Sequence, residues 1–166
     1  MELEEAKAKF IQAWGTLGSS WGINRTMSQI HALLIVSVDP LTTEEIMDQL
    51  KISRGNANMN VRALMDWGLI TKELVPGERK EYFQAGKDIW QVARQIAKER
   101  KRREVEPILE VLDQVKEVKG TGAEVDEFNR MMGELEDFTG KADTTLDKFI
   151  RSDENWFYKT LLTLMK

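Results

Sequence analysis

Residues 53–68 read SRGNANMNVRALMDWG and predict a short helix with one apolar side and one amide-rich side. Ala57, Val61 and Leu64 recur at helical spacing, which predicts a buried seam. Asparagine is a mediocre helix former, because its side chain competes with the backbone for hydrogen bonds. Three asparagines within five residues therefore suggest a use other than helix stability, and a solvated helix face is the alternative. These three are Asn56, Asn58 and Asn60.

The residues before this segment predict another short helix, over about 43–50. Thr42 and Glu45 have the spacing of a capping box, in which the two residues satisfy each other's backbone amides. Ser53 is a good N-cap for the helix that follows. Gly68 is expected just past the end of that helix, where the backbone conformation favours glycine. Two short helices joined by a tight turn predict a helix-turn-helix.

A β-hairpin is predicted directly after the second helix. LITKELV (69–75) alternates apolar and polar residues as a half-buried strand does, and Pro-Gly-Glu (76–78) is a turn signal. RKEYFQA (79–85) then returns as the second strand, so the whole unit is a winged helix. Arg79 and Lys80 at the tip of the wing are placed to reach phosphates or the minor groove, and ordinary surface is the alternative.

The polar residues of this unit predict a DNA-binding surface. An asparagine amide can pair with an adenine edge, and an arginine can bind guanine or a phosphate. Because side chains alternate around a helix, we expect some of them to contact bases and others to hold phosphates. The candidate DNA-binding residues are Thr43, Ser53, Arg54, Asn56, Asn58, Asn60, Arg62, Arg79 and Lys80.

Two segments, ISRGNANMNVRALMDWGLI (52–70) and VPGERKEYFQAGKDIW (75–90), resemble the GbsR branch of the MarR superfamily of bacterial transcriptional regulators. The similarity is closest over residues 41–90 and extends loosely over most of the chain. The resemblance implies a homodimer whose winged helices bind a pseudo-palindromic operator. Small ligands often release DNA from members of this superfamily, so a small-molecule effector is a further implied partner. A winged helix that binds protein without specific DNA binding is the alternative function.

Composition limits the class of protein. The chain has 166 residues, of which 42% are hydrophobic, and no cysteine, so disulfides and thiolate metal sites are excluded. No run of about 18 apolar residues predicts a membrane span, and the acidic N-terminus MELEEAKAKF is unlike a signal peptide. We therefore expect a cytoplasmic protein without membrane contact.

The net charge of −4 is unevenly distributed along the chain. Residues 1–103 contain 16 Lys/Arg and 13 Asp/Glu, whereas residues 104–166 contain 8 and 15. Phosphate binding depends on charges within about a Debye length, roughly 8–10 Å at ordinary salt. An acidic distal half is therefore compatible with a DNA-binding face in the first half.

The sequence argues against an enzyme. The one histidine, His31, is expected inside a helix beside Ile30 and Leu33, where a structural role is commoner than catalysis. No phosphate loop, metal cluster, nucleophile elbow or dinucleotide fingerprint is present. We therefore predict no catalytic residue, no cofactor and no metal site.

The rest of the chain is predicted to be helical, which makes the fold class mainly α with a small β-hairpin wing and long dimerisation helices. We expect N-terminal helices in 1–40, the winged helix-turn-helix in 41–86 and a helical dimerisation stem in 87–166. The expected helices are 3–17, one capped at Thr26 and ending before Pro40, 88–119 with a break near Glu106, 123–138, and 142–165. The last breaks at Ser152-Asp153 and ends in an apolar stripe of Trp156, Phe157, Leu161 and Leu164.

Two further features have competing interpretations. The basic run KERKRR (98–103) either lies near DNA or an anionic ligand, or is a solvated stem paired with an acidic stretch. The acidic residues expected there are Glu124, Asp126, Glu127, Glu134, Glu136 and Asp137. Tryptophan faces bind quaternary ammonium groups, and the GbsR resemblance implies an effector of this kind, such as choline or glycine betaine. Trp14, Trp21 and Trp90 are the candidate residues to bind it. The alternative for these tryptophans is packing in the core or in a dimer interface.

Overall fold

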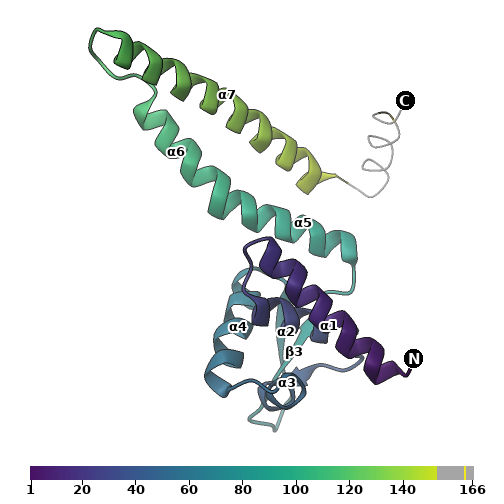
Figure 1. The fold of residues 1–166 in the computed structure, drawn as a ribbon. Helices are drawn as coiled ribbons and strands as arrows, with labels where there is room; N and C mark the ends of the chain where they lie inside the picture. The colour runs from purple at the N-terminus through teal and green to yellow at the C-terminus, as the bar shows by residue number, and fades with distance from the viewer. Residues whose placement is uncertain (153–162, 164–166) are drawn as a thin grey trace. The chain divides into compact units, whose positions relative to one another are not determined.

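The computed structural model describes residues 1–152 and 163, and the chain divides into two compact units, Met1–Val92 and Ala93–Lys166. The fold is mainly helical with one small sheet, as predicted (Figure 1). None of the described helices is long and apolar enough to cross a membrane. The helices of the first unit are α1 (Leu3–Ser20), α2 (Arg25–Val36), α3 (Thr43–Leu50) and α4 (Arg54–Asp66).

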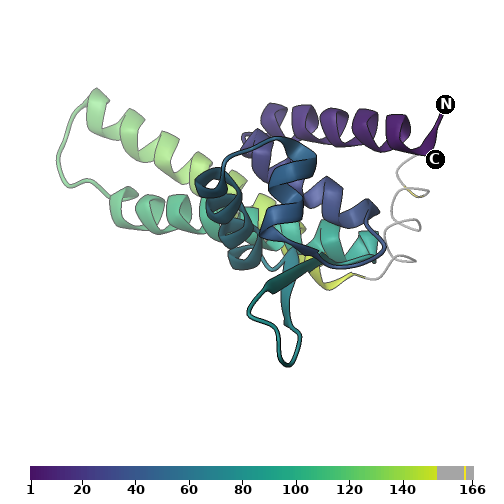
Figure 2. The same cartoon turned by 90° about the horizontal axis from the view of Figure 1, so that it is seen from below.

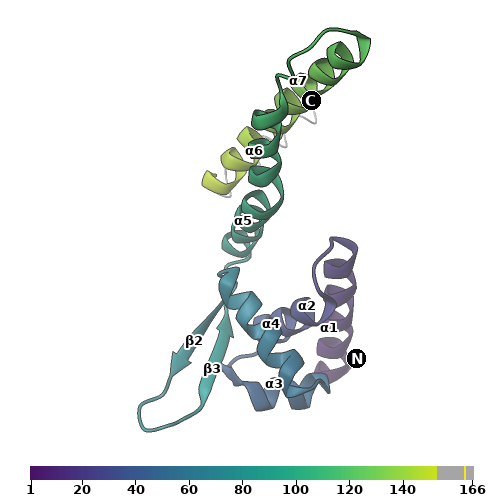
Figure 3. The ribbon, with the colours of Figure 1, turned by 90° about the vertical axis from the view of Figure 1, so that its left-hand side faces the viewer.

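The sheet contains the predicted hairpin, β2 (Ile70–Leu74) and β3 (Glu81–Ala85), and a short strand that we did not predict, β1 (Leu41–Thr42). The order is β1-β3-β2, all antiparallel, with Leu41 opposite Phe83 and Ile70 opposite Ala85. Because β1 runs directly into α3, it ties the helix-turn-helix to the hairpin. The hairpin projects beyond the helices of its unit, as a wing does (Figures 2 and 3).

Helix α2 lies at the centre of the first unit and packs against α1, α3, α4 and β3. Its side chains Ile30, Leu33 and Leu34 are almost completely buried. The predicted seam of α4 is confirmed, since Ala57, Val61 and Leu64 are all buried, as is Ile46 of α3. These residues hold the two helices in the helix-turn-helix arrangement.

Helix α1 packs closely on α2 through two glycines. A Cβ atom at Gly18 would lie 2.0 Å from Ser28 Oγ, and one at Gly15 would lie 2.6 Å from Gln29 Cγ. Helix α1 continues through both glycines to Ser20, which is three residues beyond the predicted end.

The predicted cap of α2 at Thr26 is wrong. The N-cap is Asn24, whose side-chain oxygen accepts a hydrogen bond from the Met27 amide at 3.1 Å. Asparagine and threonine are both good N-cap residues, and the sequence pattern alone did not separate them.

The second unit is a helical hairpin. Helix α5 (Ile89–Arg100) continues as a π-helical segment, η1 (Lys101–Val105), and then as α6 (Glu106–Val115). The predicted break near Glu106 thus occurs as a change of helix type. Pro107 lies in the first turn of α6, where its missing N–H costs no hydrogen bond of that helix. Helix α7 (Ala123–Arg151) packs back against α6 and η1.

The predicted gap between helices at 138 and 142 is wrong, because α7 is one helix of 29 residues. Gly140 lies in its middle, where Thr144 Oγ1 donates to the Gly140 carbonyl at 2.9 Å. The Lys141–Asp137 ion pair, 2.5 Å long, spans the same turn. The helix ends at the predicted break, with Ser152 as its C-cap. The predicted terminal stripe at Trp156, Phe157, Leu161 and Leu164 lies outside the described residues.

Candidate nucleic-acid interface

The predicted capping box fixes the start of α3. The Thr42 amide donates to Glu45 Oε2 at 2.7 Å, and the Glu45 amide donates to Thr42 Oγ1 at 3.3 Å. The Thr42 hydroxyl also donates to Glu45 Oε2 at 2.8 Å. The hydrogen bonds that the Thr42 amide and hydroxyl donate favour the carboxylate, so the pKa of Glu45 is lowered. Thr43, a predicted contact, is half-buried at the first position of the helix.

The turn between α3 and α4 is tight. Lys51 adopts the left-handed conformation, with φ of 54°, and ends α3. The Asn56 amide then donates to the hydroxyl of Ser53 at 3.3 Å, which caps α4 as predicted. Ser53 itself is exposed, so the start of α4 is open to a partner.

The outward face of α4 is formed by Gly55, Met59 and Arg62, which are exposed and follow one another at i, i+4 and i+7. Asn56 and Asn58 are half-buried. At 100° per residue they lie on opposite flanks of this face. Of the predicted residues, Arg62 is therefore central and the two asparagines lie at the edges.

Asn60 does not lie on this face, contrary to our expectation. Its side chain is 2% exposed and donates to the carbonyl oxygen of Asn56 at 2.9 Å and to Asn56 Oδ1 at 2.7 Å. The position falls within the buried seam, three residues after Ala57 and four before Leu64. The polar side chain of Asn60 suggested an exposed position, but an amide can be buried when its hydrogen bonds are made.

Arg54 begins α4 and reaches back to α3. Its guanidinium forms an ion pair with Glu44 at 2.9 Å, and both side chains are at least half exposed. Hydrogen bonds from the backbone N–H of Glu44 itself and from Arg54 lower the pKa of the Glu44 carboxyl. The nearby charge of Lys80 in the wing contributes in the same direction. The two predicted basic residues therefore share a local acidic neighbour, which the sequence analysis missed.

The wing turns through Gly77, whose φ of 88° favours glycine, and the Glu78 amide donates to the Val75 carbonyl at 3.0 Å. The Tyr82 hydroxyl donates to Glu78 Oε2 at 2.6 Å, which ties the turn to β3. Arg79 and Lys80 are exposed in the turn immediately before β3. Both are therefore available to an external partner.

The three candidate ligand tryptophans have different environments. The ring of Trp14 packs on that of Phe10, with centroids 5.6 Å apart. Trp21 follows the end of α1 and is 57% exposed, whereas Trp90 is half-buried in the first turn of α5. The effector interpretation stays a prediction.

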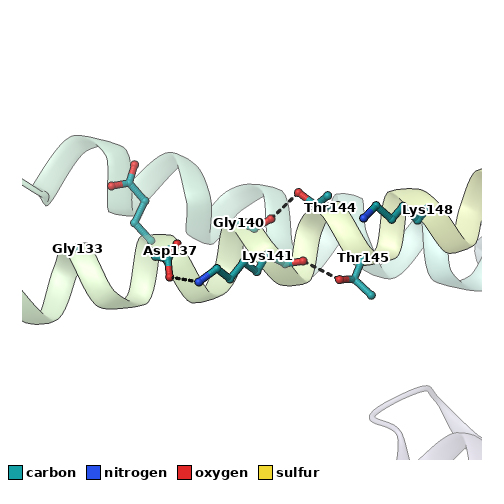
Figure 4. Close-up of a pocket in the computed structure, with 8 residues that line it drawn as sticks. Gly133, Asp137, Gly140, Lys141, Thr144, Thr145 and Lys148 are labelled. Atoms are coloured by element: carbon teal, nitrogen blue, oxygen red, sulfur yellow. Dashed lines mark hydrogen bonds and ion pairs between the residues drawn. The ribbon is translucent and has the colours of Figure 1, made fainter. Parts of the chain in front are cut away.

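An open groove of about 570 Å³ lies along α7 in the second unit (Figure 4). Two glycines, two threonines and charged side chains line it, and all of them belong to the same helix. None of the predicted site residues is among them. The lining residues are Gly133, Glu136, Asp137, Gly140, Lys141, Thr144, Thr145 and Lys148.

The basic run 98–103 is engaged within its own unit. Lys101 forms ion pairs with Asp147 at 2.9 Å and Asp143 at 3.1 Å, and a hydrogen bond to Asp147 is the main reason that its pKa is raised. Arg102 and Arg103 both contact Glu99. These contacts favour the stem interpretation of this run over the DNA-binding one, although the acidic partners differ from the predicted stretch of residues 124–137.

Comparisons with known proteins agree with this geometry. The family model of the MarR family matches residues 21–81, from the end of α1 to the first residue of β3. A crystal structure described as that of a transcriptional regulator has the same fold, with a TM-score of 0.67, 18% sequence identity, and coverage of 87% of this chain and 95% of that chain. No curated protein matches the chain. The match to the MarR family model lies over the winged helix, and the solved structure shares the fold of the chain.

Proposed function

We propose that this winged-helix protein is a sequence-specific DNA-binding transcriptional regulator of the GbsR branch of the MarR superfamily, acting as a homodimer on a pseudo-palindromic operator. The observation on which the proposal rests is the outward face of α4, whose centre is exposed and carries Arg62. In a helix-turn-helix, the second helix lies in the major groove and its N-terminal residues contact base edges. The match of residues 21–81 to the MarR family spans this helix.

The wing supports the same proposal. Arg79 and Lys80 are exposed at one end of the hairpin and belong to the same compact unit as α4. Lysine and arginine side chains there suit phosphate contacts, which position a protein on DNA without reading its sequence. In this proposal the wing orients the protein on DNA and makes its affinity depend on salt, whereas α4 recognises the bases.

Exposed apolar side chains in the second unit support self-association. Large apolar residues on α6 and α7 are 40% or more exposed in the single chain, and such surfaces commonly mark protein interfaces. A second copy of the chain would cover them and place two winged helices on one DNA duplex. The residues concerned are Ile108 and Val111 on α6, and Phe128, Leu135 and Phe138 on α7.

Selection of bound fragments from the source genome tests the DNA proposal directly. We expect a small set of fragments that share a two-fold symmetric motif, bound far more tightly than random DNA. Arg62→Ala and Asn58→Ala should weaken the specific complex. Arg130→Ala is the matched control, because Arg130 is a half-exposed helical arginine of α7 already paired with Glu127 and Glu134.

Equal affinity for selected and random DNA would overturn the proposal. In that case a protein partner for the same α4 face becomes the better function, and Arg62→Ala would then impair protein capture. Sedimentation of the free chain tests the homodimer, with Phe138→Glu expected to shift it toward the monomer. A monomer at micromolar concentration on DNA and off it would contradict the dimer.

The proposal includes a small effector, which is suggested by the superfamily and by the tryptophans. Calorimetric titration with choline and with glycine betaine tests it. Binding should release the operator and should be lost in Trp14→Ala or Trp90→Ala if these side chains hold the ligand. No heat with either compound would remove this effector class.

A further inference from the structure

Gly55 lies at the second position of α4, where glycine is not required by the fold. The backbone there is ordinary helix, and a Cβ atom would meet no heavy atom within 4 Å. Gly18 in α1 differs, because Ser28 leaves no room for a Cβ atom there. Glycine in a helix is less stable than alanine, because it loses more backbone freedom on folding. The chain therefore accepts a less stable residue at 55 without any gain from internal packing.

An open glycine is not by itself a sign of a partner, since Gly133 and Gly140 in α7 have equally open surroundings. The second observation is Met59, one turn after Gly55 on the same face of α4. Its side chain is 59% exposed although it is large and apolar. Arg62 follows at the next turn, so an apolar side chain lies between a bare backbone and a cation.

We propose that Gly55 and Met59 are specificity-determining residues for DNA: the bare backbone at Gly55 lets the start of α4 approach the major groove closely, and Met59 contacts the 5-methyl group of a thymine. This inference rests on the proposed function and adds base preference to it. Thymine presents the apolar group of the major groove, its C5-methyl. The methionine side chain is flexible and apolar, and it makes at most a weak hydrogen bond.

The surroundings favour DNA over a protein as the occupant of this face. Arg62 is exposed on the face itself, and Ser53 and Arg54 are exposed where the helix begins. Polar and cationic groups around a single apolar side chain suit a groove edged by phosphates. A protein-binding helix would present a wider apolar stripe, with several side chains at i, i+3, i+4 and i+7.

Replacement of thymine by uracil removes only the methyl group and tests the Met59 contact. Each thymine of the selected operator is replaced in turn, and the dissociation constants of the wild-type protein and of Met59→Ala are compared. At one thymine in each half-site we expect uracil to weaken wild-type binding about threefold to fivefold, as the loss of one buried methyl group predicts. Met59→Ala should not distinguish the two bases there. Val38→Ala is the control, since Val38 is an exposed apolar residue in the loop before β1.

Gly55→Ala tests the close approach. We expect this variant to be as stable to denaturant as the wild type or more so, and to bind the operator at least about tenfold more weakly. Gly133→Ala is the matched control, because it adds a methyl group to an equally open helical glycine and should leave operator binding unchanged. A loss of affinity without a loss of stability separates contact with DNA from misfolding.

The outcomes separate the two levels of the proposal. If an operator is bound specifically but Gly55→Ala binds it as the wild type does, the close approach is overturned. If uracil affects the wild type and Met59→Ala equally at every position, the methyl contact is overturned. In both cases the proposed regulator function stands. If no fragment is bound specifically, the regulator function itself fails, and this inference fails with it.

Discussion

The side-chain amide of Asn60 donates two hydrogen bonds to Asn56, one to its backbone carbonyl at 2.9 Å and one to its side-chain oxygen at 2.7 Å. Oδ1 of Asn56 has two lone pairs and accepts from Asn60 with one of them, so the side chain keeps its NH₂ group and one further acceptor site. Bidentate pairing with adenine requires an asparagine to accept as well as donate. Because the contact with Asn60 fixes the orientation of the Asn56 amide, we expect Asn56 to donate to a phosphate or a base acceptor and Asn58 to pair with adenine.

Removal of the Asn60 amide should destabilise the protein. We expect Asn60→Ala to lower the free energy of unfolding by about 1–3 kcal/mol, since it leaves a cavity and removes both hydrogen bonds to Asn56. Urea denaturation measures this change. Asn58→Ala, at a half-buried position of the same helix, is the control and should have a smaller effect. Equal stabilities of the two variants would contradict the structural role of Asn60.

Neutralising Glu44 should strengthen DNA binding. Its carboxylate pairs with Arg54 in the unbound protein and would lie beside the phosphates in the complex. Glu44→Gln removes this repulsion and frees Arg54 for a phosphate, while the exposed ion pair contributes little stability, about 0–1 kcal/mol. We expect tighter operator binding and a salt dependence steeper by about one phosphate contact.

Electrophoretic or fluorescence titration at several salt concentrations measures both quantities. Asp48→Asn serves as the matched control, because Asp48 is an exposed acidic residue of the same helix. Unchanged or weaker binding by Glu44→Gln would show that the carboxylate orients Arg54 productively.

The helical seam and the wing could be predicted because each has a strong local pattern. The spacing of Ala57, Val61 and Leu64 and the turn at Gly77 are both visible in the sequence. The burial of Asn60 was not predicted, since its environment depends on hydrogen bonds to Asn56 that composition does not reveal. The continuity of α7 through Gly140 was missed for a similar reason, because neighbouring turns outweigh the low helix propensity of one glycine.

The exposed face of α4 was predicted less well than the fold. Arg62 was placed correctly on the exposed side of α4, but Met59 and Gly55 were overlooked because an apolar residue and a glycine carry no obvious recognition chemistry. No role was predicted for Glu44. Its contact with Arg54 joins two helices, and such a contact depends on the angle between them.

Burial of His31 should make the protein less stable at acidic pH. The imidazole is 3% exposed, and burial lowers its pKa from 6.5 to about 4. The unfolded chain therefore binds a proton more readily than the folded protein, so stability is lost as the pH falls from about 6.5 toward 4. We expect the free energy of unfolding to decrease by about 2 kcal/mol between pH 7 and pH 5 on account of this group.

Denaturant titrations at these two pH values measure the change. His31→Leu removes the titrating group while preserving an apolar side chain, so its stability should depend much less on pH in this range. The same pH dependence in both proteins would show that other groups are responsible. The buried position also separates His31 from any solvent-exposed reaction, in agreement with the structural role expected from the sequence.

The packing of α1 on α2 should be sensitive to one methyl group. In Gly18→Ala the new Cβ atom would overlap Ser28 Oγ, so the two helices must separate or Ser28 must move. Overpacking of this kind typically destabilises by about 1–3 kcal/mol. Gly140→Ala is the control, since it adds the same methyl group to open space in α7 and should be neutral or stabilising. Thermal unfolding should give a lower Tm for Gly18→Ala and an equal or higher Tm for Gly140→Ala. An unchanged or raised Tm of Gly18→Ala would contradict the close contact.

The π-helical segment at 101–105 has a consequence for how related sequences align with this one. Each residue advances a helix by about 100°, so one extra residue in a wider turn rotates every later side chain relative to an uninterrupted α-helix. Lys101 reaches Asp143 and Asp147 from this segment. A homologue one residue shorter here would keep the apolar stripe of α6 in phase with α5, and its acidic partner for Lys101 would occupy a different position on α7. A single-residue gap at this point in an alignment would therefore indicate that the side chains of α6 point in a different direction relative to those of α5.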